Sequence, residues 1–144
     1  MGNNWLENNV TDLEDSKLLK EHGIFGDSLI SGDGYWRHEY NKGWSFSGNC
    51  NTKGYLEVIP AYRKDKLEAK LPEKLRCPWI WSYSFDITPV FDEISGNRLT
   101  DEKLSYLVDE FQDIRNNHNW EFQIKFFVKA CCQLLVLLKK EGVE

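Results

Sequence analysis

The order of apolar and polar residues divides the chain into a central region with strand character and two flanking regions with helical character. From Phe25 to Phe91, short aromatic and β-branched runs are separated by Gly, Asn and Pro, which is typical of strands joined by turns. On both sides of this stretch, apolar residues recur at helical spacing. We therefore predict an α+β fold with a small antiparallel sheet, over about residues 28–91, packed against an N-terminal helix and two C-terminal helices.

The clearest strand signal is a β-hairpin. The runs Tyr35–Tyr40 and Trp44–Phe46 flank Asn41-Lys42-Gly43, a three-residue connection with Gly where a left-handed conformation is needed. A further strand is predicted within 54–62, where Tyr55, Leu56, Val58 and Ile59 supply the apolar residues. The hairpin and this strand form the centre of the predicted sheet.

The segment after this strand combines two different patterns. Lys64–Leu71 has Leu67 and Leu71 one helical turn apart and is followed by Pro72, which predicts a short helix that ends there. Trp79–Phe85 then alternates large apolar residues with small polar ones, as in a strand with one aromatic face. We expect this segment to be the last strand of the sheet.

Two helices have recognisable start signals. Thr11-Asp12-Leu13-Glu14 fits a capping box, and Gly23 can end the helix that follows, which predicts a helix over about 11–22. Thr100 is an N-cap candidate with acidic residues in the next turn. After it, apolar residues follow the i, i+3, i+4 pattern of an amphipathic helix: Leu104, Leu107, Val108, Phe111 and Ile114.

The C-terminal segment Trp120–Lys140 fits two structures. Trp120, Phe122, Ile124 and Phe126 alternate with polar residues as in a strand. The same segment also has an apolar helical stripe and a basic end followed by Gly142. We favour one long, largely buried helix, while a strand over residues 120–126 remains the alternative. Charged residues interrupt the apolar run, so it does not resemble a membrane span: Glu121, Lys125 and Lys129.

The 144-residue length and the lack of internal repeats or Pro/Ser-rich linkers predict a single domain over residues 1–144. The first residues contain no basic segment followed by an apolar one, so we expect no secretory signal and a cytoplasmic protein. The four cysteines have no CxxC spacing, and we expect buried, reduced thiols: Cys50, Cys77, Cys131 and Cys132.

Net charge indicates the kind of partner. The chain has a formal charge of −5 and a pI near 5.3, which disfavours nucleic-acid binding because affinity for phosphates comes mainly from concentrated Lys and Arg. Basic residues outnumber acidic ones between Arg63 and Arg76, so the rest of the chain is more acidic than the total suggests. A basic protein partner is the natural complement, and no membrane contact is predicted.

No local motif indicates catalysis, a metal or a cofactor. The three histidines, His22, His38 and His118, are scattered and lack the spacing of metal ligands. No nucleotide-binding or nucleophile signature is present, so we predict no cofactor, no metal and no catalytic residues. One enzymatic alternative stays open, since carboxylates from distant positions could meet across the sheet: Asp33, Glu39, Glu57 and Asp86.

Two groups of residues are candidates for partner binding. Acidic residues lie along one side of the helix that follows Thr100, where they serve either solubility or recognition. Aromatic residues concentrate in the hairpin, where they form either core or an interface. The candidate partner-binding residues are Glu102, Asp109, Glu110, Asp113, Trp36, Tyr40 and Trp44.

In size, acidity, tryptophan content and lack of catalytic motifs, the chain resembles the immunity proteins that neutralise bacterial polymorphic and contact-dependent-inhibition toxins. This resemblance implies a non-catalytic protein that binds a cognate toxin domain, such as a basic nuclease, and blocks it. It assigns no site residues, because no diagnostic motif is shared. Two other functions remain: a hydrolase-like enzyme or glycan-binding domain with an aromatic-lined pocket, and a phage-type inhibitor of a host enzyme.

Overall fold

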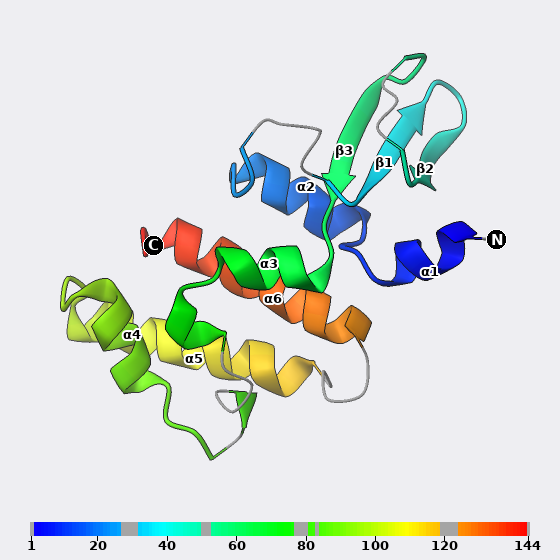
Figure 1. The fold of residues 1–144 in the computed structure, drawn as a ribbon. Coiled ribbons are helices and arrows are strands. Elements are labelled where there is room, and N and C mark those ends of the chain that lie inside the picture. Colours follow the sequence, from blue (N-terminus) through cyan, green and yellow to red (C-terminus); the bar gives the residue numbers. More distant parts are fainter. Residues whose placement is uncertain are drawn as a thin grey trace.

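The computed structural model describes residues 2–26, 32–49, 53–76, 81–82, 84–118 and 124–143. A three-stranded antiparallel sheet lies beside a helical body, so the predicted α+β class is confirmed (Figure 1). The elements in chain order are α1 Gly2–Asn8, α2 Leu13–Glu21, β1 Gly34–Glu39, β2 Gly43–Ser47, β3 Glu57–Ala61, α3 Lys64–Lys70, the 3-10 helix η2 Glu73–Leu75, α4 Thr88–Ser95, α5 Asp101–Asn117 and α6 Ile124–Lys140.

The sheet has the order β2-β1-β3 and contains the predicted hairpin. In its register, Trp36 of β1 lies between Phe46 of β2 and Ile59 of β3. The turn requires left-handed backbone at two positions, with φ of 63° at Asn41 and 73° at Gly43. Asn and Gly are the residues that adopt this conformation most readily, which is why the turn could be recognised from the sequence.

The sheet is shorter than predicted, because its strands span 34–61 rather than about 28–91. Trp81, Ser82, Ser84 and Phe85 of the expected strand Trp79–Phe85 are described, and none lies in a strand. The other three residues, Trp79, Ile80 and Tyr83, lie outside the described part of the chain. Trp81 is 3% exposed and packs against Phe111 and Phe127 of two helices, with ring centroids 5.2 and 5.7 Å apart. The aromatic pattern here reflects burial among helices and not the pleat of a sheet.

The helix α4 was not predicted: its first half, residues 88–91, falls within the predicted sheet, and its second half was assigned to no element. Its local signals are nonetheless those of a helix. Pro89 lies in the first turn, where its missing N–H costs nothing, and Gly96 closes the helix with a left-handed φ of 63°.

The helix caps are only partly as predicted. Thr100 is the N-cap of α5, where its side chain accepts a hydrogen bond from the Lys103 backbone N–H at 3.2 Å. The N-cap of α2 is Asp12 and not Thr11, one residue later than the capping-box interpretation placed it. Thr11 instead accepts the Tyr62 backbone N–H at 3.1 Å, and thus joins the start of α2 to the end of β3.

The predicted C-terminal helix is confirmed from Ile124 onwards, and residues 119–123 lie outside the described part of the chain. α6 packs against α2, α3 and α5, and forms the centre of the helical core (Figure 1). The sheet meets this body chiefly through contacts between β3 and α2. Contrary to the prediction, the two C-terminal helices pack mainly on other helices and not on the sheet. Among the described helices, none combines the length and apolar character needed to cross a membrane.

Candidate functional site: a groove beside the acidic face of α5

Three of the four predicted acidic residues of α5 are exposed, and the fourth, Glu110, is half-buried. Glu102, Asp109 and Asp113 are separated by seven and four residues, which places them on one side of the helix. Tyr106 lies between them on the same side and is 46% exposed. We call these four residues the acidic face of α5.

A groove of about 430 Å³ runs along the edge of this face, between α2, α5 and α6. Its volume lies within the range of roughly 300–1,000 Å³ that is typical of ligand sites. Apolar side chains contribute the more buried part of its lining: Leu18, Ile114, Val136 and Leu137. Polar side chains complete the lining of this α5 groove: Tyr106, Glu110, Asp113, Asn117, Gln133 and Lys140.

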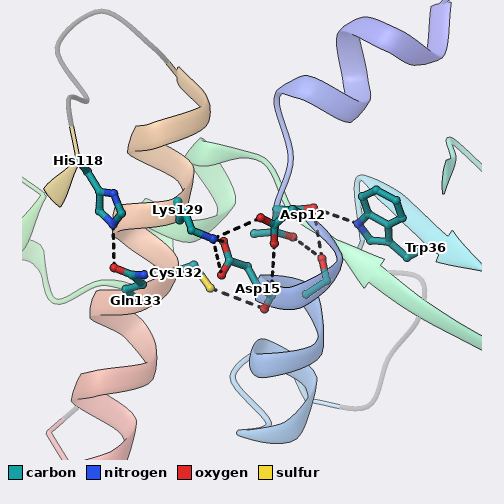
Figure 2. A network of polar contacts seen from close by, with 9 residues as sticks. Asp12, Asp15, Trp36, His118, Lys129, Cys132 and Gln133 are labelled. Atoms are coloured by element: carbon teal, nitrogen blue, oxygen red, sulfur yellow. Dashed lines mark hydrogen bonds and ion pairs between the residues drawn. The ribbon is translucent and has the colours of Figure 1, made fainter. Parts of the chain in front are cut away.

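One side-chain contact joins the two helices that border the α5 groove. His118, at the C-terminal cap of α5, contacts Gln133 of α6 through Nε2 and Oε1 at 2.7 Å (Figure 2). Gln133 itself lines the groove. The contact therefore ties the end of α5 to α6 and holds one side of the groove in place.

The predicted aromatic residues of the hairpin are less available. Trp36 is half-buried, donates its indole N–H to the Thr11 carbonyl at 3.1 Å and packs edge-on against Phe46. Trp44 is half-buried as well, between the stacked ring of His38 at 4.8 Å and the Lys17 ammonium at 4.9 Å. These two tryptophans therefore contribute to packing between the sheet and α2.

Tyr40 differs from the two tryptophans, since it lies in the hairpin turn and is 75% exposed. The hairpin and α5 lie on opposite sides of α6 (Figure 1). The structure thus does not bring the two groups of predicted partner-binding residues together: the acidic group lies beside a groove, and the aromatic group lies in the sheet.

A polar network that the sequence did not reveal joins α2 to α6. Lys129 of α6 places its ammonium 3.3 Å from Asp12 Oδ2 and 3.2 Å from Asp15 Oδ2, so two carboxylates share one cation (Figure 2). The Asp15 side chain is only 5% exposed. Asp12 and Lys129 are 117 residues apart in sequence, and no local motif could have predicted their contact.

The electrostatics of this network are unbalanced. Burial, followed by the neighbouring Asp12 charge, raises the pKa of Asp15 despite the opposing effect of Lys129. Partial burial by itself would lower the pKa of Lys129, but the two carboxylates together outweigh it and raise that pKa. Lys129 therefore does not fully compensate the burial of Asp15 beside the Asp12 charge.

The described cysteines lack the properties of reactive groups. Cys131 and Cys132 are buried on α6, as predicted, and burial raises the pKa of both thiols far above the usual range. The thiol is then the stable form, and the thiolate that nucleophilic chemistry needs is disfavoured. Cys50 and Cys77 lie outside the described residues. Within the described part of the chain, no group of three or more His, Cys, Asp or Glu side chains could hold a metal ion.

The four carboxylates considered for an enzyme of the sheet have separate local partners. Asp33 accepts the Arg63 backbone N–H at 3.0 Å, Glu57 pairs with Lys20 at 3.3 Å, and Glu39 pairs with Lys42 at 3.8 Å. Asp86 accepts the Thr88 backbone N–H, which lowers the pKa of its carboxyl. None of the four lines the α5 groove.

Comparison with known proteins does not identify the α5 groove. No protein-family model, curated protein or solved structure matches the chain.

Sequence reasoning identified Glu110 and Asp113 of the groove but missed Tyr106, Gln133 and Lys140. Tyr106 had a signal in the sequence, since it lies four residues after Glu102 and three before Asp109. Gln133 and Lys140 had none, because the pairing of α5 with α6 is a tertiary contact.

Proposed function

We propose that this protein is a non-catalytic binding protein of the immunity type, which binds a basic toxin domain in the cytoplasm and neutralises it through the acidic face of α5. The observation that supports this most directly is the position of Tyr106. This exposed aromatic residue lies among Glu102, Asp109 and Asp113 and borders a groove with an apolar lining. An aromatic anchor surrounded by charge is the arrangement that protein interfaces favour.

The charges and the groove would contribute to binding in different ways. The exposed carboxylates attract a basic partner over several ångströms and thereby raise the rate of association. The apolar lining of the groove, in which Leu18 is the most exposed residue, offers contact area that forms only after docking. Contacts of this second kind slow dissociation and so account for most of the affinity.

The α5 groove is a better interface than the hairpin because its side chains are less committed to internal packing. The rings of Trp36 and Trp44 already contact Phe46, His38 and Lys17. Recruiting these rings to a partner would cost the contacts that hold the sheet to α2. Tyr40 is largely exposed, so this cost does not apply to it, and it could serve as a second, peripheral contact.

The first experiment is a pull-down of the tagged protein from its native cells, with the product of the adjacent upstream gene co-expressed. We expect one stoichiometric partner that carries a basic toxin-like domain and elutes as salt is raised. A preparation without any stoichiometric protein partner would contradict the proposed function.

The second experiment locates the interface by association kinetics. The combined variant Glu102→Lys, Asp109→Lys and Asp113→Lys should slow association by about 10- to 1,000-fold at low ionic strength and remove most of its salt dependence. The matched control reverses the same number of exposed acids elsewhere: Asp65→Lys, Glu73→Lys and Asp92→Lys. Equal loss in both variants would indicate a general charge effect and exclude the acidic face as the interface.

A further inference from the structure

A second, smaller cavity lies at the N-terminal end of α2, where Asp12 and Asp15 line it, whereas Leu18 of the same helix lines the α5 groove one turn further on. It has a volume of about 140 Å³ and is formed by residues of α1, α2, β1 and α6 together with the α1–α2 connection. Small-molecule sites usually measure roughly 300–1,000 Å³, so this cavity is closer to the size of a single long side chain. We call it the Trp36 cavity, after the indole that forms part of its wall.

The lining of the Trp36 cavity combines aromatic rings with carboxylates. The rings are Trp36 and Phe126, and Phe126 is 37% exposed, so part of the lining is open to solvent. The carboxylates are Glu7, Asp12 and Asp15. Aromatic faces and carboxylates attract the same kind of group, a cation with an apolar stem.

The position of Trp36 is fixed by contacts outside the cavity. Its indole N–H donates to the Thr11 carbonyl (Figure 2). Its ring packs against Phe46 of the neighbouring strand. These contacts hold the ring in the wall of the cavity, which the Asp12 carboxylate also lines, without help from a ligand. A wall that is already in place reduces the entropy lost when a ligand binds.

The charges of the cavity favour one more cation. The Lys129 ammonium is the only resident cation that contacts Asp12 and Asp15 among the described residues, and both share it. Burial and the proximity of these two acids raise the pKa of Asp15, so its charge is incompletely compensated. Lys125 also lines the cavity, but its side chain is exposed, and no described residue forms an ion pair with it.

From this arrangement we propose that the Trp36 cavity binds one guanidinium group, with the cation between the Trp36 ring and the carboxylates of Asp12 and Glu7. A guanidinium suits the site better than an ammonium because it is planar, stacks on aromatic rings and donates to two carboxylates at once. The group can belong to a free arginine-like molecule or to an arginine of another protein. This site is separate from the α5 groove and does not depend on the proposed function.

The test is a titration of the full chain with arginine amide, monitored by the NMR signal of the Trp36 indole N–H. The variant Trp36→Phe assigns this signal. We expect a saturable shift of this signal, and none with citrulline amide, which has the same shape and the same α-amino group but a neutral urea in place of the guanidinium. A blocked glycyl-arginyl-glycine peptide separates the two sources. Equal affinity for the peptide indicates a side-chain site, whereas binding of arginine amide alone indicates a site for the free molecule.

Two variants test the assigned contacts. Asp12→Asn keeps an N-cap residue of equal quality and should weaken arginine binding about tenfold or more, the loss of one charge-assisted hydrogen bond. Lys125→Glu should strengthen it by about two- to fivefold, as expected for one exposed charge pair. Asp65→Asn is the control, since this exposed acid does not line the cavity.

Three outcomes would overturn the proposal: no saturable shift with either arginine probe, equal binding of citrulline amide, or unchanged affinity in Asp12→Asn. The circular dichroism spectrum and thermal midpoint of each variant establish that it is folded. The failure of these titrations would leave the pull-down and the kinetics of the α5 variants unaffected, so the two proposals can be judged separately.

Discussion

The two longest helices, α5 and α6, have the same length of 17 residues but opposite roles. α5 buries only a narrow stripe, formed by Leu107, Phe111, Ile114 and Arg115, and exposes its acidic face. α6 is buried on almost every side from Phe127 to Leu138, because α2, α3 and α5 surround it. Its two ends are the exceptions: Ile124 is 54% exposed, and Lys139 and Lys140 are exposed as well.

This difference separates stability from recognition within one helical body. A helix surrounded by neighbours contributes mainly through packing, so changes to α6 should alter the free energy of unfolding. A helix with one free face can change that face at little cost, so changes to the acidic face of α5 should alter binding instead. The predictions below test this division, from the largest effect on stability to the smallest.

Truncating a leucine should cost much more in α6 than in α5. Leu134 of α6 is completely buried, and Leu134→Ala should lower the free energy of unfolding by about 2–5 kcal/mol through lost burial and a new cavity. Leu104 of α5 is only partly buried, so Leu104→Ala should cost about half as much or less. Urea denaturation of both variants measures the difference, and equal losses would contradict the division of roles.

Removing the cation of the α2–α6 network should have the next largest effect. Lys129→Met leaves Asp15 buried with no described cation beside it, and should cost about 1–3 kcal/mol, less than a fully buried pair because Lys129 is partly exposed. Lys125→Met, one turn earlier and exposed, is the control and should stay within about 0.5 kcal/mol. Similar thermal midpoints for the two variants would show that the network does not stabilise the contact between α2 and α6.

The raised pKa of Asp15 predicts a specific pH dependence. A carboxyl whose folded-state pKa lies above its ordinary value of 3.8 stabilises the fold while protonated, and this stability is lost as the pH rises through the folded-state pKa. Asp15→Asn cannot titrate. The thermal midpoint of Asp15→Asn minus that of the natural protein should therefore rise as the pH is raised from below 3.8 to neutral. A relative midpoint that is constant or falls over this range would mean that Lys129 compensates Asp15 completely.

Neutralising the acidic face should have the smallest effect on stability. Asp109 and Asp113 are exposed, and no described residue forms an ion pair with either. Asp109→Asn and Asp113→Asn should each change the free energy of unfolding by less than about 0.5 kcal/mol. Chemical denaturation can verify this before any binding experiment, and a loss above 1 kcal/mol would show that these acids also support the fold.

Much of the fold could be predicted because its signals act over a few residues. The hairpin turn depends on Asn41 and Gly43, and the start of α5 depends on the contact between Thr100 and the Lys103 N–H. The stripe of α5 repeats every turn of the helix. Such features arise from the backbone conformation and hydrogen bonds of neighbouring residues, so a single sequence contains the information needed to recognise them.

Tertiary structure decided the rest of the fold and most of the site. The alternation at Ile124–Phe126 fits either a strand or a helix, and Trp81 fits either a sheet face or a helical core, until their neighbours are known. The pairing of Lys129 with Asp12 and the meeting of α5 and α6 at the groove join residues far apart in the chain. Residue spacing along the chain specifies which side of an element a residue occupies, but only packing among the elements determines which of those sides meet.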